Sequence, residues 1–215
     1  MSLAIGSEWS AFGVLMREIL VAAGLKPEHY LIDVGCGSGR LAHTLDVKRY
    51  LGTDIVLELI EYSREICNRP NWRFEVVDRI VIPEEDGRAD MVCFFSVFTH
   101  LLHEDSYRYL LEARRVLQTG GKVVFSFLDF AIRCHWAIFE NMVSGSASGA
   151  SRVHDQFISR DAIAAWEEHA GFAVETIYDG DVPHIRVPYP LTNESGASIT
   201  GETSLGQSVC VLRKI

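Results

Sequence analysis

Short apolar runs recur along the chain, and their length predicts strands rather than helices. Most are nearly continuous in apolar character, which is typical of parallel strands covered on both faces of a sheet. The fourth run, residues 89–96, is the clearest case. The predicted strands are YLIDVG (30–35), YLGTD (50–54), WRFEVVD (72–78), ADMVCFFS (89–96), KVVFSFLDF (122–130), FAVETIYDG (172–180) and QSVCVLRK (207–214).

Between most of these runs, apolar residues recur every three or four positions, as they do on one face of a helix. The last such segment has Ser159 at its start, where an N-cap is expected, and Gly171 just past its end. The predicted helices are 8–24, 40–45, 56–69, 106–117 and 159–170.

Strands that alternate with helices predict a parallel, doubly wound sheet. The last two strands have no helix between them, so we expect the last strand to be antiparallel. The fold class is therefore α/β, a Rossmann-like seven-stranded sheet in a single domain over residues 1–215. Two segments fall outside the pattern. Residues 131–158 contain SGSASGAS and are expected to be a flexible insert, and 181–206 form a long polar loop.

Composition limits the function classes. The 215 residues are 48% hydrophobic, enough for a large core, and the net charge of −9 argues against a nucleic-acid partner. No apolar run is long enough to cross a membrane, and the start lacks the pattern of a secretory leader. The five cysteines are scattered without a C-x-x-C pair, as in reduced intracellular proteins. We expect a cytoplasmic protein with no membrane partner; the oligomeric state stays open.

Three glycines follow the first strand directly, with the spacing Gly35-x-Gly37-x-Gly39. The dinucleotide-binding fingerprint is G-x-G-x-x-G, so the third glycine comes one residue early. An acid, Asp33, precedes them and suits a cation better than a pyrophosphate. A ligand with an ammonium, a carboxylate and a nucleoside could use Asp33 for its amine, and Arg40 with the following helix N-terminus for its carboxylate.

The segment DVGCGSGR (33–40) resembles the first motif of the class I S-adenosylmethionine-dependent methyltransferases. The resemblance continues in order through GTDIV (52–56), FEVVDRI (74–80), ADMVCFFSVFTHL (89–101) and EARRVLQTGGKVVFSF (112–127). The family often has a proline where Thr119 stands, and a turn tolerates either residue.

The resemblance implies S-adenosylmethionine as cofactor and an in-line transfer of its methyl group. It also implies that Asp54 holds the ribose hydroxyls and that Asp78 meets the adenine amino group, with the backbone of Arg79 and Ile80 on the ring edge. The implied cofactor-binding residues are Asp33, Gly35, Cys36, Gly37, Gly39, Arg40, Asp54, Ile55, Asp78, Arg79, Ile80 and Ser96.

Simpler explanations exist for single residues. An acid such as Asp54 often only caps a helix, and Cys36 is a small side chain that fits a tight loop. His100 and His103 lie three residues apart without a convincing third ligand, so no metal is expected. At the level of the whole chain, a non-catalytic S-adenosylmethionine-binding protein and an NAD-dependent oxidoreductase stay open as alternatives.

His100, just past the fourth strand, is the best-placed candidate for a general base, and His135, His154 and His184 are weaker ones. The expected acceptor is a small molecule, because FFSVFTH (94–100) lacks the Asn/Asp-Pro-Pro-aromatic motif of enzymes that methylate nucleic-acid amines. The insert and the polar loop are expected to act as lids of the acceptor site. Their side chains suited to wall a pocket are Trp136, Phe139, His154, His184, Arg186 and Tyr189. The methylated atom, oxygen, nitrogen or carbon, stays open.

Overall fold

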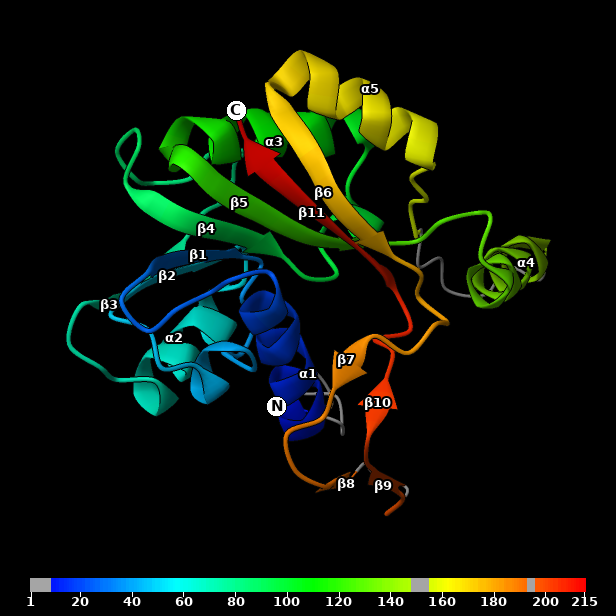
Figure 1. Cartoon of the computed structure of the whole chain (residues 1–215), viewed down its shortest axis with the longest axis horizontal. Coiled ribbons are helices and arrows are strands. Elements are labelled where there is room, and N and C mark those ends of the chain that lie inside the picture. The colour runs from blue at the N-terminus through cyan, green and yellow to red at the C-terminus, as the bar shows by residue number, and fades with distance from the viewer. Residues whose placement is uncertain (1–8, 148–154, 193–195) are drawn as a thin grey trace.

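A seven-stranded sheet forms the centre of the chain in the computed structural model, which describes residues 9–147, 155–192 and 196–215. The strand order is β3-β2-β1-β4-β5-β11-β6 (Figure 1). The sheet strands are β1 (Tyr30–Val34), β2 (Arg49–Asp54), β3 (Trp72–Val76), β4 (Ala89–Phe94), β5 (Leu117–Phe127), β6 (Phe172–Tyr178) and β11 (Ser208–Lys214). The helices are α1 (Trp9–Ala22), α2 (Leu57–Ile66), α3 (His103–Val116), α4 (Arg133–Ala147) and α5 (Arg160–Ala170), with short 3₁₀ turns η1 (Ala42–Thr44) and η2 (Phe98–His100).

The strand directions confirm the predicted fold class. β1 pairs in parallel with β2 and β4, and the parallel ladder extends to β3 and β5. β11 runs antiparallel between β5 and β6. The strand order reverses between β1 and β4, because β2 lies on one side of β1 and β4 on the other. Ligands of open α/β sheets bind at such a switch point, beyond the carboxyl ends of the strands.

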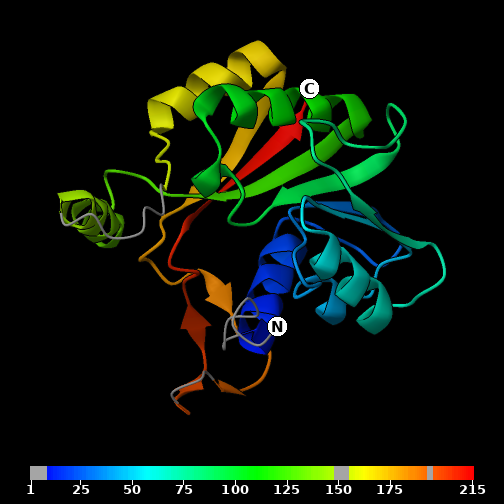
Figure 2. The same cartoon turned by 180° about the vertical axis from the view of Figure 1, so that it is seen from behind.

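Helices cover both faces of the sheet, with α1 and α2 on one face and α3 and α5 on the other (Figures 1 and 2). The first face buries Leu15 and Ile19 of α1 with Ile60 of α2, and the second buries Leu110 of α3 with Ile163 of α5. Each residue is at most 4% exposed, so strands such as β4 lie between two apolar layers. This explains why their sequences are almost continuously apolar.

The prediction that residues 131–158 form a flexible insert without an element of their own is wrong, because α4 occupies Arg133–Ala147. Aromatic packing compensates for the serine and glycine content of the helix. Trp136 and Phe139 lie 5.1 Å apart between ring centroids, and Phe139 also packs edge-on against Phe157 at 5.7 Å. Residues 148–154, including His154, lie outside the described residues.

The predicted helix at 40–45 is also wrong, since only the 3₁₀ turn η1 forms there. The connection from Gly39 to β2 is short, and α1 packs tightly on it. A Cβ atom on Gly13 of α1 would lie 2.3 Å from the carbonyl oxygen of Arg40. The hydroxyl of Thr44 donates to the carbonyl of Leu41 at 2.8 Å, which favours the tight turn over a continued helix.

Residues 181–206, expected as a loop, contain two small antiparallel ribbons on the side of α1 (Figure 1). One pairs β7 (Ile185–Arg186) with β10 (Glu202–Thr203), and the other pairs β8 (Leu191–Thr192) with β9 (Ser198–Ile199). Ile185 and Leu191 are buried in the same apolar cluster as α1. The segment is polar overall, so these few buried apolar positions did not form a strand pattern in the sequence.

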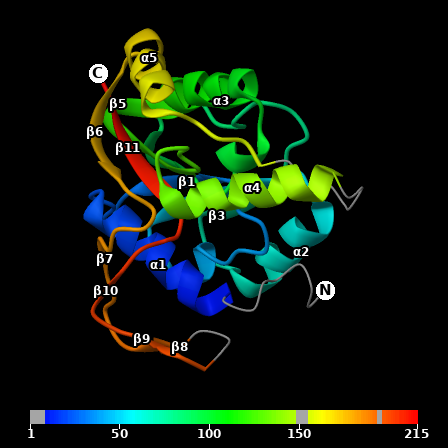
Figure 3. The same ribbon diagram turned by 90° about the vertical axis from the view of Figure 1, so that its right-hand side faces the viewer.

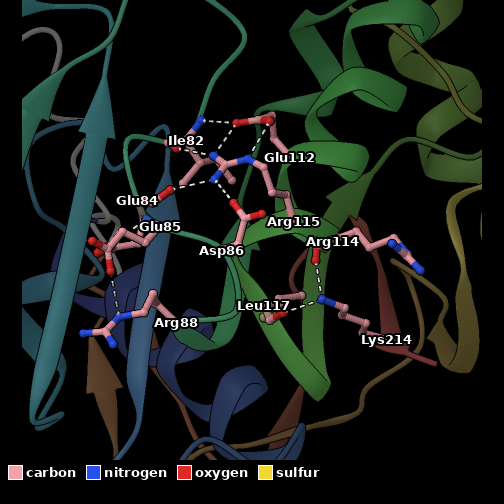
Figure 4. Close-up of polar contacts among 10 residues, drawn as sticks. All are labelled: Ile82, Glu84, Glu85, Asp86, Arg88, Glu112, Arg114, Arg115, Leu117 and Lys214. Atoms are coloured by element: carbon pink, nitrogen blue, oxygen red, sulfur yellow. Dashed lines mark hydrogen bonds and ion pairs between the residues drawn. The ribbon is translucent and has the colours of Figure 1, made fainter.

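A network around Arg115 fixes the connection between β3 and β4 onto α3 (Figure 4). The Arg115 guanidinium donates to the Glu112 carboxylate at 2.8 and 3.0 Å, to Asp86 at 2.8 Å, and to the carbonyls of Ile82 and Glu84 at 2.8 and 2.7 Å. Its hydrogen bonds to Glu112 lower the pKa of that carboxyl. The network therefore holds the chain just after Asp78, one of the predicted cofactor residues.

Candidate functional site

The three glycines form a tight loop at the carboxyl end of β1. All three have positive φ angles, 77° at Gly35, 54° at Gly37 and 77° at Gly39. The amides of Gly35 and Cys36 both donate to the carbonyl of Thr53 in β2, at 2.7 and 2.9 Å. A Cβ atom on Gly35 would lie 2.4 Å from a methyl group of Val97. Glycine is therefore required here both by backbone conformation and by close packing.

Asp54 links the end of β2 to this loop. One carboxylate oxygen accepts the Gly37 amide at 2.9 Å, and the other accepts the Val56 amide at 3.0 Å. Val56 is the residue before the first turn of α2, so Asp54 does stabilise a helix start, as the simpler explanation proposed. A carboxylate has about four acceptor positions, so two remain for a ligand.

A cavity of about 420 Å³ lies beside Asp54, at the carboxyl ends of β1, β2 and β4. Its walls combine apolar side chains with acids at two points, Asp54 and Asp78. Ile55 is 71% exposed, which is high for a large apolar side chain and leaves a flat apolar wall free for a ligand. The lining residues are Val34, Gly35, Thr53, Asp54, Ile55, Val56, Val77, Asp78, Arg79, Ile80, Ser96, Val97, His100, Leu101 and Tyr109.

The structure brings most of the predicted site residues to this cavity. The predicted residues that line it are Gly35, Asp54, Ile55, Asp78, Arg79, Ile80, Ser96 and His100. Those that do not are Asp33, Cys36, Gly37, Gly39 and Arg40. Sequence reasoning missed the apolar lining, including Val97, Leu101 and Tyr109. The apolar run after β4 was the available indication for the first two, because it continues past the end of the strand.

Asp33 lies under the glycine loop rather than in the cavity. Its carboxylate accepts the Tyr50 hydroxyl at 2.7 Å and faces the Cys93 thiol at 3.5 Å. The side chain is 3% exposed, and burial raises the pKa of Asp33 to about 6. Burial also raises the pKa of the neighbouring Cys36 thiol, which makes a thiolate nucleophile unfavourable there.

Arg40 packs against α1. Its guanidinium carbon lies 5.7 Å from the ring centroid of Phe12, and burial lowers the pKa of Arg40. The two charged residues that flank the glycines, Asp33 and Arg40, thus both have protein surroundings. A direct contact of either with a ligand stays a prediction.

Ser96, at the end of β4, has a strained backbone with φ of 56°. Such a conformation costs a non-glycine residue about 1–3 kcal/mol and is common at binding sites. The Ser126 hydroxyl accepts the Ser96 amide at 2.8 Å, and the Ser96 hydroxyl donates to Gln207 at 3.3 Å. β5 and the start of β11 therefore hold this corner of the cavity in place.

The comparison with known protein families covers the stretch of chain that forms most of this cavity. A sequence profile described as a methyltransferase domain matches residues 32–125, from β1 into β5. This stretch contains the glycine loop, Asp54, Asp78 and the strained corner at Ser96. Residues 32–125 therefore match a methyltransferase domain, in agreement with the class I S-adenosylmethionine-dependent methyltransferase family that the motifs resemble. S-adenosylmethionine is the cofactor of this family.

Individual relatives support the assignment. The chain is 24% identical over 176 residues to a ubiquinone biosynthesis O-methyltransferase of Coxiella burnetii, covering 79% of this chain and 71% of the relative. It is 33% identical over 107 residues to ribosomal RNA-processing protein 8 of Caenorhabditis briggsae, covering 49% and 28%. The chain spans about a third or less of the first curated relatives that it matches, 34% of one and 28% of the other.

The fold matches solved structures over nearly its whole length. One is a Thermotoga maritima S-adenosylmethionine-dependent methyltransferase described as a possible histamine N-methyltransferase. It superposes with a TM-score of 0.65 at 19% identity and covers 96% of this chain and 92% of that one. The likeness confirms the architecture of the methyltransferase fold.

The cavity beside Asp54 fits an adenosine-bearing cofactor in size and chemistry. Ligand pockets usually have about 300–1,000 Å³, and this one lies within that range. Asp54 retains acceptor positions for vicinal hydroxyls, Asp78 offers a second acceptor, and Ile55 offers an apolar face between them. The acids also suit the positive charge of a sulfonium.

The histidines of the chain differ in their surroundings. His100 lines the cavity, its side chain is 56% exposed, and its Nδ1 lies 3.5 Å from Oδ1 of Asp155. His135, in the first turn of α4, is fully buried against the segment that precedes β11. Its Nδ1 accepts the Asp129 amide at 2.9 Å, so its Nε2 carries the proton and donates to the carbonyl of Gly206 at 3.0 Å. His135 has therefore no free nitrogen for proton transfer.

His184 lies at a different cavity. Its ring stacks on Tyr178 at 4.5 Å, and it lines a space of about 180 Å³ with Glu18 of α1 and Arg186. Neither His135 nor His184 is among the residues lining the cavity beside Asp54, which leaves His100 as the described base candidate there.

A metal-binding cluster and a membrane-spanning helix are both absent from the described residues. Within 9–147, 155–192 and 196–215, no three or more His, Cys, Asp and Glu side chains gather closely enough to hold a metal ion. No helix in the described part of the chain is long and apolar enough to span a membrane.

Proposed function

We propose that this chain catalyses transfer of a methyl group from S-adenosylmethionine to a small molecule. The observation that carries the proposal is the placement of Asp54 and Asp78 on one cavity with the exposed Ile55 at the switch point of the sheet. The acids come from the ends of different strands, and both match the order of the family motifs.

In this proposal, Asp54 binds the ribose hydroxyls through the acceptor positions that Gly37 and Val56 leave free. Asp78 accepts the adenine amino group, and the backbone at Arg79 and Ile80 meets the ring edge. The glycine loop allows close approach of the rest of the cofactor to the backbone. Bound S-adenosylmethionine supplies an electrophilic methyl group, and the chain's own work is to align the acceptor and exclude water.

Helix α4 supports a small-molecule acceptor. It lies across the carboxyl ends of the strands (Figure 3), the end of the sheet whose residues also line the cavity. Phe130 and Trp136 are 45% and 44% exposed, and Phe130 stacks on Phe157 at 4.6 Å between centroids. An exposed aromatic surface suits a flat organic acceptor better than a phosphate backbone. The insert therefore remains our proposed lid of the acceptor site.

A nucleic-acid acceptor is the second candidate, because one relative is named a ribosomal RNA-processing protein. Its match covers 28% of that protein. The net charge of −9 disfavours this candidate, since phosphate contacts need clustered basic residues. A protein that binds the cofactor without transferring its methyl group is a third candidate on the same cavity.

The test is a release assay for S-adenosylhomocysteine with the purified chain. The acceptors are a panel of hydroxylated and aminated metabolites, with total RNA as a parallel arm. Transfer to a metabolite and none to RNA supports the proposal. Transfer to RNA alone favours the second candidate, and tight cofactor binding without any transfer favours the third.

A further inference from the structure

His100 faces an acid that comes from a distant part of the sequence. Nδ1 of His100 lies 3.5 Å from Oδ1 of Asp155, and the two residues are separated by α3, β5 and α4. The Asp155 side chain is 20% exposed, whereas that of His100 is 56% exposed and lines the cavity. In the described part of the chain, Asp155 forms no other ion pair. Asp155 is thus the more buried member of the pair and is not among the residues that line the cavity.

Both residues sit on backbone that is firmly held. The Gln156 amide donates to the carbonyl of Thr99 at 2.7 Å, which ties the segment after Asp155 directly to η2. The Ile158 amide donates to Leu128 at the end of β5 at 2.9 Å, and Ile158 is fully buried. On the other side, Phe98 of η2 is fully buried as well. The backbone next to each member of the pair is therefore held in place by the fold.

The neighbouring His103 differs from His100 in what its ring nitrogen contacts. The Nε2 of His103 donates to the carbonyl of Phe157 at 2.9 Å, and its ring packs edge-on against Trp166. His103 is thus used to hold the 155–158 segment in place. For His100, the contact with an acid is on Nδ1, and this leaves Nε2 for a ligand.

An acid on one imidazole nitrogen determines where the ring proton lies. A carboxylate only accepts, so it favours the tautomer with hydrogen on Nδ1 and a lone pair on Nε2. We propose that Asp155 is a positioning residue that holds His100 in this tautomer, and that the methyl acceptor is therefore a hydroxyl group. This inference rests on the proposed function and names the acceptor class of the same site.

The chemistry of the acceptor gives the reason. A neutral amine already presents a lone pair, and its proton can leave after transfer. A hydroxyl must lose its proton before or during attack, and a phenol has a pKa near 10. The hydroxyl oxygen forms the new bond to the methyl carbon, the carbon–sulfur electron pair stays on sulfur, and the hydroxyl proton passes to Nε2 of His100. The resulting imidazolium is stabilised by the Asp155 carboxylate.

Other charged or titratable groups share the cavity with His100. Those lining it are Asp54, Asp78, Arg79 and Tyr109. They are retained in every variant below, so a change seen on substituting Asp155 is assigned to that residue.

The experiment measures the tautomer directly, without any acceptor. Long-range ¹H–¹⁵N correlation spectra of the full chain at pH 8 are recorded for wild type, Asp155→Asn and Asp105→Asn, with His100→Gln for assignment. Asp105 is a matched control, because it pairs with Arg108 on the exposed side of α3. We expect the Nδ1–H tautomer of His100 in wild type and Asp105→Asn, and a shift toward Nε2–H in Asp155→Asn. The same tautomer in all three overturns the role of Asp155.

The acceptor class is tested with matched probes, catechol and o-phenylenediamine, which share a ring and differ in hydroxyl against amine. We expect methyl transfer to catechol, with kcat reduced roughly 10- to 100-fold in Asp155→Asn while the KM for S-adenosylmethionine is unchanged. Partial recovery in Asp155→Glu would further separate positioning from folding. Transfer to the diamine alone overturns the hydroxyl assignment. If the wild-type chain does not bind S-adenosylhomocysteine, the proposed function is contradicted instead. The spectra would still decide the role of Asp155.

Discussion

The carboxylate of Asp54 accepts the backbone amide of Gly37 at 2.9 Å. Together with the hydrogen bonds from the Gly35 and Cys36 amides to the Thr53 carbonyl, this bond joins the end of β2 to the glycine loop after β1. An acid expected to bind a ligand thus also shapes the loop beside that ligand. Loss of Asp54 therefore acts on the cofactor site twice, through a missing acceptor and through a loosened loop.

We expect Asp54→Ala to weaken S-adenosylhomocysteine binding by at least about 1.5–3 kcal/mol, the range for hydrogen bonds to a charged group. Isothermal titration calorimetry measures the change. Asp46→Ala is the control, because Asp46 is a fully exposed acid on the connection that precedes β2. Equal affinities of the two variants would show that Asp54 does not bind the cofactor.

Gly35→Ala should destabilise the fold more than Gly87→Ala. Both glycines have similar φ angles, 77° and 65°, so both substitutions incur the left-handed strain of about 1–2 kcal/mol. A Cβ at position 87 meets open space, whereas at position 35 it lies 2.4 Å from Val97. We expect the clash to add about 1–3 kcal/mol in urea unfolding. Val97→Ala in the Gly35→Ala background should recover part of the loss, and equal losses in the two single variants would contradict this packing.

The buried carboxyl of Asp33 gives the stability a defined pH dependence. Its pKa is about 6 in the folded chain, against about 3.9 when unfolded. Because the folded state holds the proton more tightly, this group lowers the free energy of unfolding as pH rises from about 4 to above 6. The effect is on the order of 3 kcal/mol.

Asp33→Asn removes this titration, so its stability relative to wild type should rise with pH over that window and then level off. Comparing the two proteins cancels the opposite contributions of Glu84 and Glu112, whose pKa values are lowered. Urea unfolding at several pH values from 4 to 8 measures the difference. A difference that stays constant with pH would show that Asp33 is not buried as described.

His100 and His135 should respond to substitution in opposite ways. His135→Ala leaves the buried Asp129 amide without its partner and removes the hydrogen bond to the Gly206 carbonyl, which should cost roughly 1–3 kcal/mol of stability. His100→Ala should change stability by less than about 0.5 kcal/mol but lower turnover of a hydroxyl acceptor by roughly 10²–10⁴-fold. Thermal unfolding and a release assay distinguish the two. Unchanged turnover in His100→Ala would exclude it as the base.

Sequence periodicity predicted the sheet well because its strands lie between two apolar layers. The run 89–96 is apolar for this reason, and β4 follows it closely. The cavity acids were also predictable, since Asp54 and Asp78 are the last residues of two predicted strands. What could not be predicted depends on register between strands. Asp33 is enclosed only because Tyr50 and Cys93 lie on the neighbouring strands β2 and β4 beside it.

The remaining differences arise from tertiary contacts that override local composition. Helix α4 contains serines and glycines that favour a loop, and its aromatic contacts with Phe130 and Phe157 compensate for them. Asp155 was not foreseen either, because nothing in its local sequence places it beside His100. The conformation of Ser96 likewise depends on Ser126 and Gln207 from other strands.

Binding of S-adenosylmethionine in the cavity beside Asp54 is the property on which the other assignments depend. Its most direct test is a calorimetric titration of the purified chain with S-adenosylhomocysteine and, separately, with NADH. We expect one S-adenosylhomocysteine per chain with micromolar affinity, about −8 kcal/mol, and no measurable heat with NADH. Binding of NADH in the absence of S-adenosylhomocysteine binding would contradict the account.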